Sequence, residues 1–340
     1  MKFDHFQKEL NMINENAKLN KKLFTQAPDM TPIRNGFGEG IVELGKENDR
    51  VVVLTADLKE STRVDEFAKQ FPERFFEVGV AEQNMVTIAA GLAVGGKIPF
   101  VTSYAVFSPG RNWEQIRTTI CYNNVNVNIA GHHTGLMTGP DGATHQALED
   151  IAIMRVLPNM TVFVPCDAIE AKKATKAMTH IQNAGYIRLA RDPSALITTE
   201  ETPFTPGKAN ILWESKKPKV TIIACGTMVA RSLFAAEELE KEGIGSVVIN
   251  MHTIKPIDSK TIITYAKKTK CVVTAEEHQI AGGLGSAVAE VLAMNYPVPQ
   301  EFVGVKDAFG ESGKPNELFE KYGLGVKDIK TAAYRIVKRF

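Results

Sequence analysis

The sequence predicts two consecutive α/β domains with mostly parallel sheets. Three observations indicate this fold: short continuous apolar runs separated by helical stretches, a length of 340 residues, and a break in composition near residue 200. A continuous apolar run is typical of a strand covered on both faces, and strands alternating with helices favour a parallel sheet. A chain of this length exceeds the usual size of one domain.

The first α/β unit is expected over residues 25–200, after a polar helical arm at 1–24. Glycines in the helix predicted at 33–44 suit close packing. The apolar run Val51–Thr55 that follows predicts a buried strand. The remaining predicted elements are strands at 125–130, 161–164 and 186–189 and helices at 81–94 and 168–179.

Residues 201–219 are expected to form a linker, because this stretch has three prolines, mixed charge and weak periodicity. A second α/β unit follows at 220–340, with strands expected from 220, at 246–250 and at 271–275. The stretch Gly282–Ser286 lacks the strand–GxGxxG–helix context of a dinucleotide site. It is better interpreted as a tight turn before a packed helix.

Composition excludes several classes of function. Forty basic residues nearly cancel thirty-nine acidic ones, so the net charge of +1 gives no footprint for nucleic acid or an acidic membrane. The four cysteines are scattered and contain no CxxC pair, which favours reduced buried thiols over a disulfide frame or zinc site. The charged N-terminus lacks the apolar core of a signal peptide, and no apolar run approaches the roughly 20 residues that span a bilayer. We expect a soluble cytoplasmic protein.

A glycine-rich loop at 131–146 holds three histidines, among them His133 and His145, together with Asp141. Ligands of α/β sheets bind at the carboxyl ends of strands, and this loop follows a predicted strand. Histidine suits proton transfer near neutral pH. A metal site is a competing interpretation, but no HxH or helical HxxxH pair supports it. A polar loop whose histidines bond to backbone is the structural alternative.

Glu82 begins an otherwise apolar helix. A carboxylate at this place could cap the helix amides or lie on a solvated first turn, and both are common. The aromatic residues Tyr104, Phe107 and Trp113 could belong to the core or form a wall for a flat heteroaromatic ring.

Four polar residues could hold an anion. Arg191 follows the strand at 186–189, where an arginine can bind a phosphate through two hydrogen bonds or simply pair with Asp192. Arg34, Ser61 and Arg63 leave the same two alternatives open.

From about residue 31 onward the chain resembles the pyrimidine-binding and C-terminal domains of transketolases. Five landmarks carry the resemblance through their order and spacing. They are Ala56-Asp57-Leu58 with Ser61, the stretch 74–83 (RFFEVGVAEQ), the stretch 99–104 (PFVTSY), the loop from His133 to Gln146, and Arg191.

The resemblance implies a thiamine-diphosphate-dependent transketolase, which moves a two-carbon ketol unit from a ketose phosphate to an aldose, as in pentose phosphate metabolism. Glu82 would bond the pyrimidine ring of the cofactor and promote its activation, since a carboxyl in an apolar pocket can share a proton with the ring. Tyr104, Phe107 and Asp57 would contribute to the cofactor site. One extra residue before the helix at 113–117 leaves open which aromatic ring stacks on the pyrimidine.

The same resemblance implies the substrate site. His133 and His145 correspond to histidines that contact the sugar hydroxyls and the reacting carbonyl, and Asp141 to an aspartate that reads a hydroxyl. Arg34, Ser61 and Arg191 correspond to the group that holds the sugar phosphate.

The chain contains no Gly-Asp-Gly, the mark of the domain that binds the diphosphate through Mg²⁺. The resemblance therefore implies a partner subunit that carries this domain, in a heterotetramer with two copies of each chain and a homodimer of this one.

Three alternatives stay open. Deoxyxylulose-phosphate synthases share similar segments but usually carry aspartate in place of His133. Beta subunits of 2-oxoacid dehydrogenases usually lack the GPDGATHQ loop. A non-catalytic regulatory subunit would be favoured by a missing glutamate, and Glu82 is present.

Overall fold

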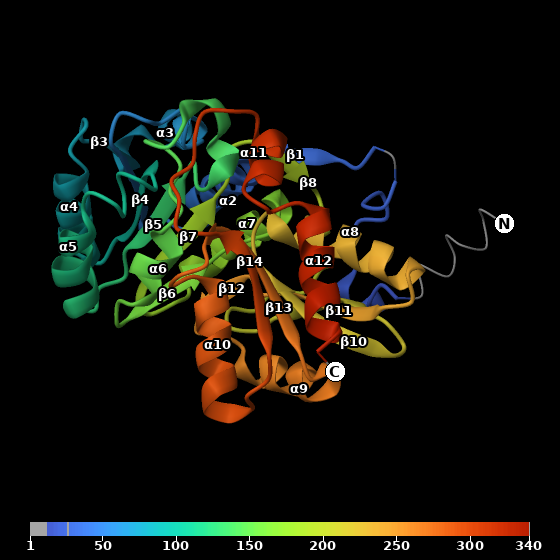
Figure 1. Ribbon diagram of the computed structural model, residues 1–340. Helices are drawn as coiled ribbons and strands as arrows, with labels where there is room; N and C mark the ends of the chain where they lie inside the picture. The colour runs from blue at the N-terminus through green and yellow to red at the C-terminus, as the bar shows by residue number, and fades with distance from the viewer. Residues whose placement is uncertain (1–11, 26, 340) are drawn as a thin grey trace.

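Two sheets organise the chain in the computed structural model, which describes residues 12–25 and 27–339. One sheet has seven strands and the other has five, and helices lie on both sides of each (Figure 1). Neighbouring strands are parallel in both sheets except at the edge strands β12 and β9. The predicted fold, two α/β units with mostly parallel sheets, is confirmed.

The seven-stranded sheet carries the first unit. Its strands in spatial order are β12 (Thr253–Lys255), β6 (Met160–Phe163), β7 (Ala184–Leu189), β5 (Asn128–His132), β4 (Ile98–Tyr104), β2 (Val51–Thr55) and β3 (Phe75–Glu77). Its α-helices are α2 (Ile33–Glu47), α3 (Asp65–Gln70), α4 (Glu82–Val94), α5 (Trp113–Gln115), α6 (Asp150–Arg155) and α7 (Ala168–Met178). Three further helical segments are η2 (Pro72–Arg74), the π-helical η3 (Ile116–Tyr122) and the 3-10 segment η4 (Leu136–Asp141).

The five-stranded sheet carries the second unit. Its strands in spatial order are β14 (Gln300–Val305), β13 (Val272–Gln279), β10 (Pro218–Ala224), β11 (Gly245–Asn250) and β9 (Asn210–Glu214). Its helices are α8 (Met228–Lys241), α9 (Ser259–Thr269), α10 (Leu284–Asn295), α11 (Pro315–Lys321) and α12 (Val326–Val337). The Glu276 carboxylate accepts hydrogen bonds from the first amides of α10, at Leu284 (2.7 Å) and Gly285 (2.8 Å). The turn at Gly282–Ser286 therefore begins a capped, packed helix.

The burial of β2 shows why its continuous apolar run was informative. All five of its residues are buried. Val51 and Val53 belong to one hydrophobic cluster, which includes α2, while Val52 and Leu54 belong to the other, which includes α4. Side chains alternate between the faces of a strand, so a strand between two helical layers needs apolar residues throughout.

Two edge strands cross the expected domain division. β9 lies inside 201–219, the expected linker, yet it pairs antiparallel with β11. β12 lies inside 220–340, yet it pairs antiparallel with β6 of the first unit. β12 has only three residues, and β9 has polar residues at both ends of a three-residue apolar run, so neither shows a clear strand pattern. The division into units at 25–200 and 220–340 stays a prediction.

The described part of the N-terminal arm packs onto the second unit. Residues 1–11 of the predicted helical arm lie outside the described residues, and residues 12–24 contain the single short 3-10 turn η1 (Glu15–Ala17). The Asn14 side chain donates to the carbonyl of Ile211 (2.9 Å), and Leu23 is fully buried. A small antiparallel pair, β1 (Met30–Pro32) and β8 (Pro193–Ala195), joins the start of the first unit to the segment after β7.

Two strands end later than the sequence predicted, because polar residues continue their pairing with neighbouring strands. The strand expected at 125–130 begins at Asn128 and ends at His132, and the one expected at 271–275 runs on to Gln279. All four cysteines are buried free thiols, as predicted. Within residues 12–25 and 27–339, no helix combines the length and apolar character needed to cross a membrane.

Candidate active site

Glu82 is a buried carboxylate at the first position of α4. It is 1% exposed, and its Oε2 accepts a hydrogen bond from Nη1 of Arg111 at 2.8 Å. The residue before it, Ala81, makes no side-chain cap, and the Glu82 carbonyl accepts from the Asn112 side chain at 2.9 Å. The carboxylate therefore does not cap its own helix. It is turned toward the segment that follows β4.

That segment places two aromatic rings beside each other. Tyr104 ends β4, and Phe107 lies in the turn that follows, with 6.0 Å between ring centroids and 13° between ring planes. The Arg111 guanidinium carbon lies 4.9 Å from the centre of the Phe107 ring. Arg111 thus contacts both Glu82 and Phe107, and it connects the two halves of the predicted cofactor site.

The loop after β5 brings the predicted histidines to the same place. His133 stacks on Tyr104 with centroids 3.8 Å apart and planes at 23°. His145 meets Tyr104 and Phe107 edge-on, at 6.0 and 5.6 Å. His132 is turned away, edge-on to Phe37 of α2 at 5.1 Å. The structure therefore collects His133 and His145 around one aromatic surface, and their roles in substrate binding stay a prediction.

His133 is electrostatically a neutral imidazole. It is 2% exposed, and Nη1 of Arg34 lies 3.4 Å from its Nε2. Burial, followed by the positive charges of Arg34 and Arg191, lowers the pKa of His133 to about 3. Its Nδ1 is buried without a hydrogen-bond partner among the described residues. A buried polar atom without a partner is rare and costs free energy, so this atom fits a ligand group.

Three arginines converge beside His133. Burial, followed by the charges of Arg63 and Arg191, lowers the pKa of Arg34 to about 10. Arg34 donates to the Ser61 carbonyl at 2.8 Å, so Ser61 contributes its backbone here. Arg191 is the second residue after the end of β7. It donates to the Thr138 carbonyl at 2.8 Å and to Asp141 at 3.3 Å. Like charges held close together are stabilised by a bound anion, and guanidinium groups suit phosphate.

Asp141 and Asp57 differ in how far they join this cluster. Asp141 lies on the loop and pairs with Arg191. Asp57 is exposed, adopts a left-handed φ of 60°, and is held by its backbone amide, which donates to Glu77 Oε1 at 2.8 Å. Glu77 also accepts the Gly79 amide at 2.9 Å. The cofactor role predicted for the Asp57 side chain stays a prediction.

Sequence reasoning missed Arg111 and Thr138. The hydroxyl of Thr138 donates to the His133 carbonyl at 2.7 Å, so this residue contacts both His133 and Arg191. Arg111 lies four residues after Phe107, which is the one signal in the sequence that places it near the ring. Within the described ranges, no group of three or more His, Cys, Asp or Glu residues is arranged to hold a metal ion.

Comparisons with known proteins identify the family. Residues 29–199 match the family model for the transketolase pyrimidine-binding domain, and residues 207–329 match that for the transketolase C-terminal domain. The chain belongs to the transketolase family. It is a transketolase-type subunit, and this family depends on thiamine diphosphate.

Relatives of similar length are subunits of split enzymes. The chain is 43% identical over 307 residues to a 6-deoxy-6-sulfo-D-fructose transketolase subunit of Clostridium sp., covering 90% of this chain and 95% of the relative. It is 36% identical to one of the subunits of an apulose-4-phosphate transketolase of Phocaeicola vulgatus, covering 92% of this chain and all of the relative. A solved structure described as a split gene transketolase, inactive beta4 tetramer, is 47% identical with a TM-score of 0.84, over 91% of this chain and 99% of that one.

The residue set fits the pyrimidine half of thiamine diphosphate. A flat aminopyrimidine needs an aromatic surface and a buried carboxyl that can exchange a hydrogen bond with a ring nitrogen. Tyr104 and Phe107 supply the surface and Glu82 the carboxyl, while Nδ1 of His133 has no partner among the described residues. These features agree with the family.

Proposed function

We propose that this protein is the cofactor-activating subunit of a split transketolase and that Glu82 promotes activation of thiamine diphosphate. The observation that supports this most directly is the fully buried Glu82 carboxylate, turned toward the Tyr104–Phe107 pair through Arg111. When bound, thiamine diphosphate supplies the carbanion that attacks the donor carbonyl. The residues of this chain orient the reactants, exclude water and move protons.

Each group has a proposed task. Glu82 holds a hydrogen bond to the pyrimidine ring and shares a proton with it. Tyr104 and Phe107 provide the surface on which the ring lies. His133, which is neutral, can donate from Nδ1 to a sugar oxygen, and His145 acts beside it as a proton carrier. Asp141 accepts a hydrogen bond from a sugar hydroxyl.

We propose that the substrates are sugars with a terminal anion, bound by Arg34 and Arg191 near Ser61. Burial, followed by repulsion from Arg63 and Arg191, already lowers the pKa of Arg34, and a phosphate would relieve that repulsion. One relative is named for a sulfonated sugar and another for a phosphorylated one. The terminal anion is therefore the part of the substrate that the arginines recognise, with a sugar phosphate as the preferred form.

We further propose a partner subunit that binds the diphosphate through Mg²⁺, in a two-plus-two assembly built on a homodimer of this chain. The sequence lacks a Gly-Asp-Gly motif, and the related beta4 tetramer is described as inactive. We also propose a cytoplasmic location, which the four buried free thiols support.

The test is reconstitution. The chain is coexpressed with a subunit that carries the diphosphate-binding domain, and the complex is screened with ketose phosphates, the matching unphosphorylated ketoses and a sulfonated ketose. Ketol transfer to an aldose acceptor that requires both subunits and thiamine diphosphate is expected, with a preference for anionic donors. Full activity of this chain by itself would contradict the proposal of a partner, and decarboxylation of 2-oxoacids without ketol transfer would contradict the proposed reaction.

A further inference from the structure

The loop of residues 133–148, here called the substrate loop, is backed by the second unit. Helix α11 packs against η4. The Gln146 side chain donates to the Glu311 carbonyl at 2.9 Å, and the Leu148 carbonyl accepts the Gln279 amide at 2.8 Å. The substrate loop, which carries Asp141 and His145, thus packs against residues of the second unit at several points.

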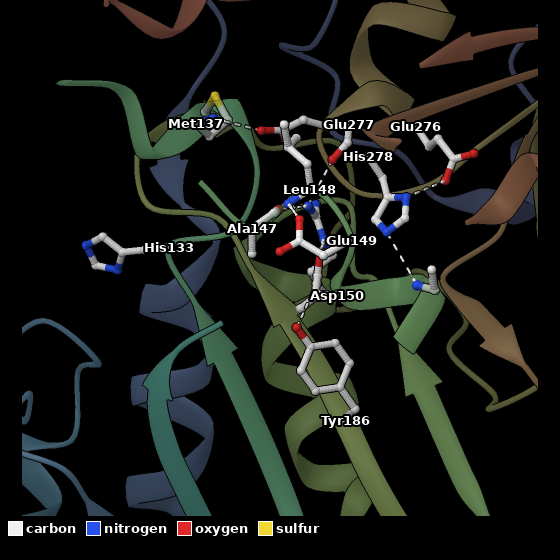
Figure 2. Close-up of polar contacts among 12 residues, drawn as sticks. His133, Met137, Ala147, Leu148, Glu149, Asp150, Tyr186, Glu276, Glu277 and His278 are labelled. Atoms are coloured by element: carbon white, nitrogen blue, oxygen red, sulfur yellow. Dashed lines mark hydrogen bonds and ion pairs between the residues drawn. The ribbon is translucent and has the colours of Figure 1, made fainter. Parts of the chain in front are cut away.

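Glu277 makes the most specific of these contacts (Figure 2). It lies on β13 and is 2% exposed. Its Oε1 accepts the Met137 backbone amide at 2.7 Å. Its Oε2 accepts the Thr227 hydroxyl at 2.5 Å. The backbone makes room for the carboxylate at Gly135, where φ is +67° and an added Cβ would lie 2.2 Å from Oε1.

The position of Met137 matters because Thr138 follows it. Thr138 uses its hydroxyl to hold the His133 carbonyl at 2.7 Å and its own carbonyl to hold Arg191 at 2.8 Å. A displacement of the backbone at Met137 is therefore transmitted directly to a residue that fixes both His133 and Arg191. Glu277 can thus influence the two residues through the backbone of the loop.

The buried side chain of Arg188 binds both sides of the contact between the substrate loop and β13. Arg188 on β7 donates from Nη2 to the carbonyls of Glu277 (2.9 Å) and Ala147 (3.2 Å), while its Nε pairs with Asp150 at 2.9 Å. Asp150 also accepts the Tyr186 hydroxyl at 2.7 Å. The Arg188 side chain thereby holds both the end of the substrate loop and the strand that carries Glu277.

We propose that Glu277 is a positioning residue for the transketolase reaction: its carboxylate fixes the substrate loop at Met137, so that the C-terminal domain sets the geometry of His133 and Arg191. This inference rests on the proposed function of the loop in binding the donor sugar. It assigns a task to a domain that contributes none of the predicted catalytic side chains.

The neighbouring residue Glu276 supplies a matched control. It lies on the same strand, is equally buried, and points away from the substrate loop (Figure 2). Its carboxylate accepts the backbone amides of Leu284 and Gly285. Glu277→Ala and Glu276→Ala each remove one buried carboxylate that accepts backbone amides. Glu277→Gln keeps an acceptor for Met137, and Thr227→Val removes only the hydroxyl that holds the carboxylate, for use if Glu277→Ala does not fold.

The first measurement is amide hydrogen exchange of the purified chain, followed by mass spectrometry of peptides from the substrate loop and from the start of α10. We expect Glu277→Ala to speed exchange at 137–138 by about tenfold or more, because the amide loses a charged acceptor, with Thr227→Val showing a smaller effect. Glu276→Ala should speed exchange at 284–285 instead. Unchanged exchange at 137–138 in both Glu277→Ala and Thr227→Val would overturn the proposal, and so would a Glu277→Gln variant as impaired as Glu277→Ala.

The second measurement is steady-state kinetics of the complex with the partner subunit. Glu277→Ala should raise KM for the donor sugar by about tenfold or more while the affinity for thiamine diphosphate stays unchanged, and Glu276→Ala should lower Tm without changing donor KM. Faster exchange with unchanged donor kinetics would leave Glu277 as the anchor of the loop and contradict the proposed role of that loop in donor binding.

Discussion

His133 should make the free energy of unfolding depend on pH, and replacing His133 should remove its part of that dependence. Its pKa is lowered to about 3 in the folded protein by burial and then by Arg34 and Arg191. The unfolded chain has an ordinary histidine with a pKa of about 6.5. Between these two pKa values the unfolded state binds more protons at His133 than the folded state does. The contribution of His133 to the free energy of unfolding is therefore complete above about pH 6.5 and is lost as the pH falls toward 3.

The expected magnitude follows from the unfolded pKa alone, provided that the folded value lies well below the lower pH of the experiment. From about pH 7 to about pH 5.5, proton uptake by His133 in the unfolded state lowers the free energy of unfolding by about 1.2 kcal/mol. Asparagine is the matched replacement, because His133 has a φ of 52° and asparagine tolerates the left-handed region well.

The assay compares wild type with His133→Asn at equal protein concentration, by urea unfolding at the two pH values. Loss of the His133–Tyr104 stack shifts both values of the variant equally, whereas the pH-dependent difference should shrink by about 1.2 kcal/mol. The other buried histidines are present in both proteins, so their effects cancel. Equal pH dependence in the two proteins would refute the claim that His133 is a buried neutral imidazole.

Three further predictions concern the proposed enzyme. Arg191→Gln should raise KM for phosphorylated donors by about 10- to 100-fold, since a charged hydrogen bond contributes roughly 1.5–3 kcal/mol; an equal effect on unphosphorylated donors would remove the phosphate from its role. Calorimetry of the chain alone with thiamine diphosphate and Mg²⁺ should show weak binding, and submicromolar affinity without a partner would contradict the shared cofactor site. Light scattering of the coexpressed complex should give the mass of two copies of each subunit, and a stable one-to-one species would count against that assembly.

Much of the fold could be predicted because the strands of the first sheet are buried on both faces. Val51–Thr55 is apolar throughout for that reason, and it forms β2 with the predicted bounds. β9 and β12 could not be predicted, because their pairing depends on partners distant in the sequence and not on any pattern of their own. The polar end of β13 is hidden for a related reason, since Glu276 and Glu277 are buried by contacts with turns that the sequence does not place beside them.

The candidate site divides in the same way. Glu82, His133, His145, Asp141 and Arg191 lie on motifs whose order and spacing resemble a family, and the structure places His133 and His145 on one aromatic surface. Arg111 and Glu277 lie outside these motifs, and Thr138 lies in the loop from His133 to Gln146 but is not among the residues that the resemblance singles out. They act through single contacts across a turn or between domains, such as the 140 residues that separate Met137 from Glu277, and such contacts become visible only in three dimensions.

The central claim is that Glu82 promotes activation of the cofactor, and Glu82→Gln separates this from a structural role. Glutamine keeps the shape and a hydrogen bond but cannot share a proton with the ring. The ion pair that it removes joins Glu82 to an Arg111 side chain that is 48% exposed, so the stability lost should stay below about 1 kcal/mol.

The decisive measurement is the rate of hydrogen–deuterium exchange at the thiazolium carbon of thiamine diphosphate, in the complex assembled with wild-type or Glu82→Gln subunit. A loss of roughly 3–5 kcal/mol in transition-state stabilisation should slow exchange by about a hundred- to several-thousand-fold in the variant, with little change in Tm. Exchange at the wild-type rate in a correctly assembled Glu82→Gln complex would contradict the account, because Glu82 would then have no part in forming the reactive carbanion.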